Sequence, residues 1–390
     1  MADPPRVAVV GGGIAGLATA WYLTRDAPGQ VTLVEAGNRA GGKIRTDEVG
    51  GTPVEGGPDT FLARVPWAVD LCRDLGLGDD LVPPATGQAY VWARGGLRPL
   101  PDGLVLGVPT TFAPLLRSGI VSPAGAARAA LDVVLPPHPF PEDPSVADVV
   151  RSRMGSEVLD QLVDPLIGGI NAGSSEALSL RATAPQLADA LDRHRSLALG
   201  LRQRPVDSAT GPVFLGLRGG LERLVDRLRE SLKGVELRTS TRVTRISALV
   251  DGRHQVECDP GPGVVADAVV VATPAYVAAD LLEAAANDLQ RIDYASVVVT
   301  TLGYRPDAVR HRLDGSGFLV PRSEGWLTTA CTWSTSKWPE LKATGLTLLR
   351  ASAGRAGDER ALAMDDDTLV ERLHAELDGV LGLSERPATV

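Results

Sequence analysis

"RVAVVGGGIAGLATAWYL", residues 6–23, joins an apolar run to a glycine cluster and then to a second apolar-rich segment. This order predicts a buried strand, a tight turn and a helix. Gly11 permits the turn, Gly13 lets the backbone approach a pyrophosphate at the helix N-terminus, and Gly16 lets helix and strand pack closely. The stretch therefore predicts an α/β fold with a Rossmann-like, dinucleotide-binding domain.

A second apolar run, "VTLVEA", ends at Glu35, which lies 19 residues beyond Gly16. This is near the spacing at which a carboxylate meets the ribose of a bound dinucleotide. Another glycine pair with flanking cations follows at once: Arg39, Gly41, Gly42 and Lys43. A second close backbone approach and two cations beside the same diphosphate favour FAD, since an exchangeable NAD needs only the first loop. The alternative interpretation is a basic surface turn.

Length and charge limit the classes of function. A chain of 390 residues is long enough for two or three domains with a sizeable core. A net charge of −9 argues against a nucleic-acid surface, which needs a basic face. We therefore expect a globular protein without a nucleic-acid partner.

Cysteine and histidine are too scattered for a local metal site. Cys72, Cys258 and Cys331 lie far apart without a CxxC pair, as expected for buried thiols in a reducing cytoplasm. The chain enters its first strand directly after "MADPPR", and proline interrupts its longest apolar stretches. We predict no metal, no signal peptide, no integral membrane segment and a cytoplasmic location.

Periodicity along the chain predicts a helical insertion between two sheet-forming regions. Asp59 and Thr60 are expected to cap the helix in "VPWAVDLCRDLGL", and Arg94 to Gly96 to turn a hairpin. Four strand-like runs after residue 296 predict an antiparallel sheet, and "DDDTLVERLHAELDGVLGL" a closing helix. The predicted domains are a discontinuous FAD-binding domain, 1–84 and 219–275; a substrate-binding α+β domain, 85–108, 202–218 and 276–390; and a helical subdomain, 109–201.

Motifs along almost the whole chain resemble those of the flavoprotein oxidases of haem biosynthesis, the protoporphyrinogen and coproporphyrinogen oxidases, within the wider amine-oxidase-like group. They include "VEGGPDTFLAR", "DPLIGGINAGSSEALSLRATAPQL", "GLRGGLERL", "DAVVVATPAY" and "ACTWSTSKWP". "ATGQ", "LPDGLVLGVPT" and "HRSLALG" are most similar to the coproporphyrinogen III oxidases of Gram-positive bacteria.

The resemblance implies roles for individual residues. The glycine loop would cradle the FAD pyrophosphate, Glu35 and Ala36 would lie at the adenosine ribose, and Val243 would contact adenine through its backbone. The turn at residues 57–60 would lie beside the flavin ring. Arg64 and Asn171 are substrate candidates. The implied cofactor-binding residues are Gly11, Gly12, Gly13, Ile14, Ala15, Gly16, Glu35, Ala36, Gly42, Lys43, Gly57, Pro58, Asp59, Thr60 and Val243.

The reaction that the resemblance implies is the oxidation of coproporphyrinogen III to coproporphyrin III. Six electrons and six protons leave the porphyrinogen, and three O2 become three H2O2. Flavin N5 is the expected hydride acceptor, so no catalytic side chain is predicted. The ferrochelatase and the decarboxylase of the same pathway are implied partners.

This sequence departs from the family pattern at several positions. Asn171 and Ser174 stand where the family commonly has tyrosine and aspartate, and Val65 stands where some relatives have lysine. The chain ends at "LSERPATV", before the family's Pro-Gln-Tyr segment and the glycine-rich stretch that packs on the flavin. We therefore expect either a fragment of a longer protein or a chain that binds flavin weakly. The alternatives left open are a protoporphyrinogen IX oxidase, another FAD-dependent amine oxidase or desaturase, and a truncated chain that binds a porphyrin or a partner without turnover.

Overall fold

A computed structural model describes residues 4–25, 29–203 and 211–390, and the chain divides into two compact units. Unit 1 comprises Met1–Glu48, Pro53–Pro83 and Thr210–Asp293, and unit 2 comprises Val49–Thr52, Pro84–Ala209 and Tyr294–Val390. Parts of the predicted domains, residues 1–3, 26–28 and 204–210, lie outside the described residues. The three-part division made from the sequence stays a prediction.

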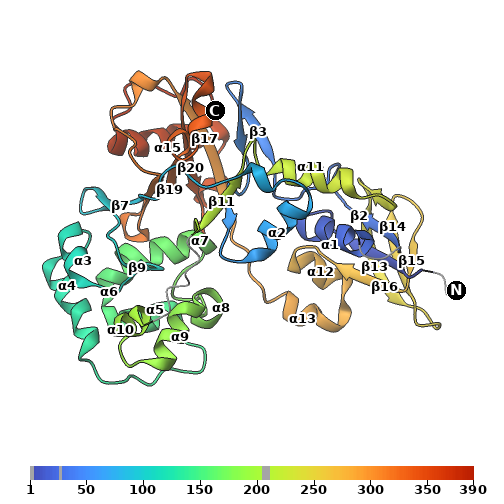
Figure 1. Cartoon of the computed structure of the whole chain (residues 1–390), viewed down its shortest axis with the longest axis horizontal. Coiled ribbons are helices and arrows are strands. Elements are labelled where there is room, and N and C mark those ends of the chain that lie inside the picture. Colours follow the sequence, from blue (N-terminus) through green and yellow to red (C-terminus); the bar gives the residue numbers. More distant parts are fainter. Residues whose placement is uncertain (1–3, 26–28, 204–210) are drawn as a thin grey trace. The chain divides into compact units, whose positions relative to one another are not determined.

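Unit 1 is built on a four-stranded parallel sheet in the order β12-β2-β1-β16, of which β2 and β16 are labelled in Figure 1. These strands span Arg6–Val10 (β1), Gln30–Val34 (β2), Val235–Arg238 (β12) and Ala268–Val271 (β16). Strands β1 and β16 are nearly continuous apolar runs, as in parallel sheets that are covered on both faces, whereas β12 alternates apolar and charged residues. Helix α1 (Ile14–Arg25) packs against β2 and α11 (Glu222–Ser231), burying Leu17 and Leu228 completely. The predicted Rossmann-like strand, turn and helix is confirmed.

Short elements complete unit 1 and its connections. They are β3 (Thr46–Val49), β4 (Thr52–Glu55), β5 (Phe61–Leu62), α2 (Pro66–Asp74), η1 (Gly78–Asp80), β6 (Leu81–Val82), β11 (Phe214–Leu217), β13 (Arg242–Ala248), β14 (His254–Asp259), β15 (Val264–Ala266), α12 (Ala275–Leu281), η4 (Glu283–Ala285) and α13 (Ala286–Leu289). The expected cap of α2 by Asp59 and Thr60 is wrong. The helix begins at Pro66, whose fixed φ suits the first turn of a helix, after an extended Val65 that provides no side-chain cap.

Unit 2 contains a six-stranded sheet in the order β17-β20-β19-β18-β7-β8. Its strands are β7 (Tyr90–Ala93), β8 (Gly96–Pro99), β17 (Val298–Tyr304), β18 (Gly317–Leu319), β19 (Thr328–Trp333) and β20 (Thr347–Ala353). The predicted hairpin and the predicted antiparallel pairing of the last four strands are confirmed. The hairpin joins the larger sheet through a parallel pairing of β7 with β18, which local sequence did not reveal.

Helix α15 (Asp366–Leu381) contributes one apolar stripe to the core beside this sheet, where Leu373 and Trp333 are fully buried. Asp365 caps it by accepting the Thr368 N–H at 2.9 Å, and the predicted closing helix is confirmed. The remaining short elements around the sheet are β9 (Leu104–Val105), β10 (Val108–Pro109), η5 (Pro306–Ala308), η6 (Arg322–Glu324), α14 (Ser334–Lys337), η7 (Pro339–Thr344) and η8 (Arg360–Ala363).

The rest of unit 2 is helical, as predicted for residues 109–201, and follows the teal-to-green part of the chain in Figure 1. It contains α3 (Phe112–Ser118), α4 (Pro123–Ala130), η2 (Leu131–Val133), α5 (Val146–Met154), α6 (Ser156–Val158), η3 (Leu159–Gly168), α7 (Gly169–Asn171), α8 (Leu180–Thr183), α9 (Pro185–Arg193) and α10 (Leu197–Arg202). Segment η3 is π-helical and contains Pro165, which cannot donate to an α-helical ladder.

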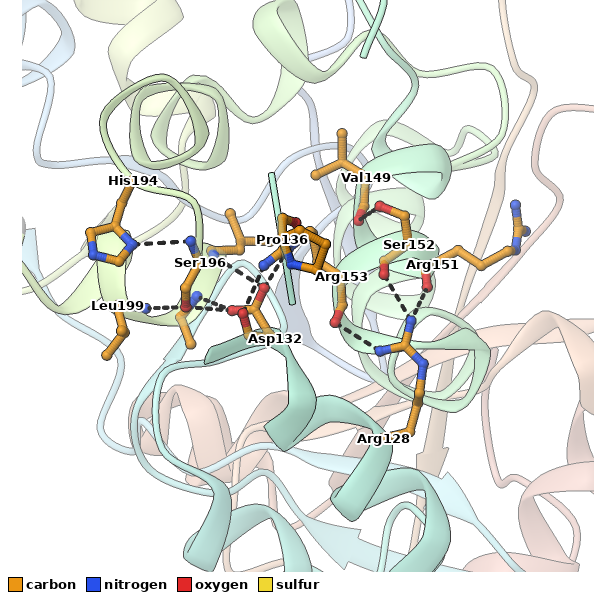
Figure 2. Close-up of polar contacts among 12 residues, drawn as sticks. Arg128, Asp132, Pro136, Val149, Arg151, Ser152, Arg153, His194, Ser196 and Leu199 are labelled. Carbon is orange, nitrogen blue, oxygen red and sulfur yellow. Dashed lines mark hydrogen bonds and ion pairs between the residues drawn. The ribbon is translucent and has the colours of Figure 1, made fainter. Parts of the chain in front are cut away.

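A buried ion pair joins three of these helical segments. Arg153 and Asp132 are 2% and 0% exposed, and Arg153 Nε donates to Asp132 Oδ1 at 2.6 Å. The same guanidinium donates to the carbonyl oxygens of Asp132 and Pro136, at 2.7 and 2.8 Å. Asp132 Oδ2 accepts the Ser196 hydroxyl at 2.7 Å and the Ala198 N–H at 2.9 Å, at the start of α10 (Figure 2). Because the partners satisfy each other, the charges can remain in an apolar core.

Candidate functional site

The first glycine loop lies between β1 and α1, at the carboxyl edge of the parallel sheet. Gly11 has a φ of 104°, and a Cβ there would lie 2.7 Å from the Ala272 carbonyl oxygen. A Cβ on Gly16 would lie 1.8 Å from the Gly11 carbonyl oxygen. At Gly13, by contrast, a Cβ would meet no described atom within 4 Å. The loop is therefore packed tightly against protein at two glycines and is open at the third.

Helix α1 presents backbone donors beside this open position. Its first intrahelical bond runs from Leu17 N–H to the Gly13 carbonyl oxygen at 2.9 Å. Three earlier N–H groups have no intrahelical carbonyl oxygen as hydrogen-bond acceptor, because they lie in the first turn: those of Ile14, Ala15 and Gly16. Together with the positive end of the helix dipole, these donors suit a phosphate. Open space at Gly13 and first-turn donors fit the pyrophosphate of a dinucleotide.

Glu35 is fixed directly beside the first loop, just past the end of β2. Its carboxylate accepts the N–H groups of Gly12 and Gly37, both at 2.6 Å. Its own N–H donates to the Arg238 carbonyl oxygen at 2.8 Å. The next residue, Ala36, is exposed. An oriented carboxylate at this sheet edge fits the ribose of a bound dinucleotide.

The second glycine pair lies against the first loop. Gly41 N–H donates to the Gly12 carbonyl oxygen at 2.7 Å, and Gly41 forms an isolated bridge with Gly13. A Cβ on Gly42 would lie 3.1 Å from the Gly13 Cα. The two glycine clusters, separated by a helix and a strand in sequence, thus form one backbone surface. This proximity supports the prediction of a single extended cofactor site.

Arg39 makes several contacts to the backbone of the second glycine loop, and its predicted place near the diphosphate stays a prediction. Its guanidinium donates to the carbonyl oxygens of Gly42 at 3.0 Å and Ile44 at 3.1 and 3.2 Å. It also pairs with Glu222 at 3.4 Å. The side chain therefore braces the second glycine loop from within. Lys43, the other predicted cation, is exposed.

Two acids missed in the sequence also hold this loop. Glu222, the first residue of α11, accepts the Thr46 N–H at 2.8 Å, and Glu55, the last residue of β4, accepts the Leu221 N–H at 2.5 Å. The sequence signal for Glu222 was an acid in the first turn of a predicted helix, which also suits an ordinary helix start, and Glu55 had no such signal. Gly57 also packs against this loop, since a Cβ there would lie 2.0 Å from the Lys43 carbonyl oxygen.

The other predicted cofactor residues lie in the same unit. Pro58 is exposed, and the Thr60 hydroxyl donates to Asp59 Oδ1 at 3.2 Å. Val243, on β13, is 8% exposed and belongs to the core cluster that includes Val34. The Thr241 N–H, two residues earlier, donates to the Glu35 carbonyl oxygen at 3.0 Å. The start of β13 is thereby tied to the predicted ribose acid, while the adenine contact of Val243 stays a prediction.

The two substrate candidates belong to different units. Arg64, in unit 1, is exposed, and no hydrogen bond or ion pair of its side chain is found among the residues that the structure describes. Asn171, at the end of α7 in unit 2, donates through Nδ2 to the Ile167 carbonyl oxygen at 2.8 Å. Each assignment stays a prediction.

The cysteines are poorly suited to nucleophilic chemistry. Burial raises the pKa of Cys72 to about 11, and it also raises the pKa of Cys331. In the described ranges, no group of three or more histidine, cysteine or acidic residues is arranged to hold a metal. Within the same ranges no helix has the length and apolarity needed to cross a membrane.

Replacement of Glu35 by glutamine tests its role at the ribose. The amide would place an NH2 group against one of the two N–H donors and remove the charge, so the dissociation constant for FAD should rise about 10- to 150-fold. Titration of the flavin-free chain with FAD, followed by flavin fluorescence, measures this change. Glu230→Gln, on an exposed pair with Arg227, is the matched control. Equal FAD affinity in the Glu35 and Glu230 variants would contradict the assignment.

Comparison with known proteins agrees with this site. The sequence pattern of flavin containing amine oxidoreductases matches residues 14–390. The chain is 38% identical to the coproporphyrinogen III oxidase of Bacillus subtilis (strain 168), over 98% of this chain and 84% of the relative. It is 32% identical to the coproporphyrinogen III oxidase of Staphylococcus aureus (strain NCTC 8325 / PS 47), over 98% of this chain and 85% of the relative. A crystal structure from Exiguobacterium sp. 255-15, assigned as a protoporphyrinogen oxidase, matches with a TM-score of 0.88 and 33% identity, over 100% of this chain and 86% of that one.

Proposed function

The chain belongs to the family of flavin-containing amine oxidoreductases, and on this premise we propose that it oxidises coproporphyrinogen III to coproporphyrin III with FAD as its cofactor. The observation that carries this proposal is the 38% identity over nearly the whole chain to a coproporphyrinogen III oxidase. The proposed reaction belongs to haem b biosynthesis by the coproporphyrin-dependent route.

In this proposal the polypeptide binds and orients the cofactor and the substrate, and a bound FAD would supply the hydride-accepting chemistry. The first turn of α1 and the open edge at Gly13 would hold the diphosphate, and Glu35 would hold the ribose. Arg39 and Glu222 keep the second glycine loop against the first. O2 is the proposed electron acceptor, with one H2O2 formed for each O2 consumed.

Turnover of the two porphyrinogens is the direct test. We expect the FAD-loaded chain to oxidise coproporphyrinogen III with a higher kcat/KM than protoporphyrinogen IX, as measured by the fluorescence of the porphyrin product. In the same samples, three O2 should be consumed and three H2O2 formed for each porphyrin molecule produced. A preference for protoporphyrinogen IX would contradict the proposal and support the alternative activity, that of a protoporphyrinogen IX oxidase. Oxidation of an amine, with neither porphyrinogen consumed, would support the alternative of another FAD-dependent amine oxidase.

The flavin content of the purified chain tests the cofactor separately. We expect a yellow protein with close to one FAD per chain, measured by absorbance after gel filtration. A folded but colourless protein that takes up no FAD would instead support the non-catalytic alternative, in which the chain binds a porphyrin or a partner without turnover.

Location and partners are also part of the proposal. Two of the three cysteines are buried as free thiols, which suits the reducing cytoplasm. A ferrochelatase or a decarboxylase of the haem pathway is proposed as a partner on the resemblance alone.

A further inference from the structure

A half-buried arginine in unit 2 has no partner for its charge. Arg355 lies in the tight turn after β20, where its N–H donates to the Asp358 carbonyl oxygen. Its guanidinium makes no hydrogen bond or ion pair within the described ranges, and its Nε is buried without an acceptor. Burial lowers the pKa of Arg355, and the positive charge of Arg322 lowers it further. A cation held in this way destabilises the unliganded protein unless an anion binds to it.

The nearby acids are already used by other arginines. Asp358 pairs with Arg360 at 2.8 Å, and this hydrogen bond holds the pKa of Asp358 at about 2. Asp164 accepts the Ser175 N–H at 3.0 Å and lies 3.7 Å from Arg322 Nε. Both carboxylates act on Arg355 only from beyond ion-pair distance. One positive charge is therefore left over in this part of the unit.

The turn that carries Arg355 is fixed to the segment that contains the substrate candidate Asn171. Ala356 N–H donates to the Ala172 carbonyl oxygen at 2.7 Å. Arg322 donates to the Gly173 carbonyl oxygen at 3.0 Å and to the Ala356 carbonyl oxygen at 3.5 Å. Arg322 thus links the two turns, and Arg355 is positioned beside the residues that follow α7.

Unsatisfied polar atoms gather around the same turns. Among the described residues, nine buried side-chain nitrogen or oxygen atoms lack a hydrogen-bond partner, and four of them belong to these segments: Gln161 Oε1, Ser175 Oγ, Arg322 Nε and Arg355 Nε. Gln161 Nε2 reaches Ser323, the neighbour of Arg322, at 3.4 Å. Ser175 Oγ and Arg355 Nε can donate to an anion, Arg322 Nε already faces Asp164 Oδ2 at 3.7 Å, and Gln161 Oε1 needs a donor such as water. Buried polar groups are rarely left unpaired, so such a group indicates a missing polar partner.

We infer that Arg355 binds a carboxylate group of the substrate, with Arg322 and Asp164 holding its turn in place. This inference rests on the proposed function, because coproporphyrinogen III carries four propionate side chains and protoporphyrinogen IX only two. A guanidinium binds a carboxylate through two parallel hydrogen bonds, which also orient the bound group. Arg355 would thereby help to select the porphyrinogen that has more carboxylates.

Binding of the product tests this assignment independently of turnover. Coproporphyrin III keeps all four propionates and is fluorescent, so it can be titrated into the FAD-loaded chain. Loss of a charged hydrogen bond in Arg355→Met should weaken its binding about 10- to 150-fold. Arg355→Lys, which keeps the charge but not the planar fork, should be intermediate. Arg312→Met, at an exposed arginine of the same unit, is the matched control and should bind as the parent does.

Stability separates a binding role from a structural one. Because the Arg355 charge is half-buried and unpaired, Arg355→Met should keep or raise the Tm of the porphyrin-free protein while it weakens porphyrin binding. The inference would be overturned if Arg355→Met lowered the Tm as well as weakening binding, or if this variant bound coproporphyrin III as tightly as the parent. It would also be overturned if the parent chain did not bind coproporphyrin III. A parent that binds coproporphyrin III in an Arg355-dependent way but oxidises neither porphyrinogen would refute only the proposed function.

Discussion

Gly13→Ala should give a folded protein that has lost most of its affinity for FAD. The new methyl group meets no protein atom within 4 Å, and the backbone at this position is one that alanine can adopt. It would, however, occupy the space where the diphosphate must approach the loop. Overpacking of this kind costs about 1–3 kcal/mol, which corresponds to an FAD dissociation constant raised about 5- to 150-fold.

Flavin absorbance after gel filtration and titration of the flavin-free chain measure the effect of Gly13→Ala, with circular dichroism and Tm as measures of the fold. Gly16→Ala is the informative comparison, because its methyl group would lie 1.8 Å from the Gly11 carbonyl oxygen. That variant should lose about 1–3 kcal/mol of unfolding free energy as well as FAD. If Gly13→Ala bound FAD with the same dissociation constant as the parent, the diphosphate would not bind at this edge.

Arg153→Met should lower the unfolding free energy of unit 2 by about 3–5 kcal/mol, because it leaves the carboxylate of Asp132 buried without its cation. Urea denaturation followed by circular dichroism measures this loss. The double variant Asp132→Asn and Arg153→Met should recover much of it, since the asparagine oxygen can still accept donors at the start of α10 (Figure 2).

Arg151→Gln provides the control on the same helix. Arg151 pairs with Glu176 in an exposed position, with side chains 42% and 59% exposed. Such surface pairs contribute about 0–1 kcal/mol. Equal destabilisation by Arg151→Gln and Arg153→Met would show that burial of the ion pair is not what stabilises these helical segments.

The parts of the fold that the sequence predicted are those determined by neighbouring residues. The glycine spacing from Gly11 to Gly16 follows from local steric demands, and the structure has the strand, turn and helix that it predicts. The hairpin turn at Arg94 and Gly95 was predictable for the same reason, because both residues adopt the positive φ of a two-residue hairpin turn.

The missed features depend on residues far apart in sequence. Glu222 pairs with Arg39, which lies 183 positions earlier in the sequence, and the residues around either one give no indication of this pairing. The error at the start of α2 has a related cause, since Pro66 can begin a helix without the polar cap that Asp59 and Thr60 offered. Arg355 was missed because only tertiary structure shows that its neighbours have other partners.

The cofactor loop depends on parts of the chain that are synthesised late. The glycine loops are complete by Lys43, but β1 pairs with β16 at residues 268–271, and Glu222 holds the second loop. During synthesis, the first 84 residues therefore emerge without the strand and the helix that complete their sheet and loop. FAD should be taken up only after residue 271 has been made, so cofactor uptake follows the synthesis of β16.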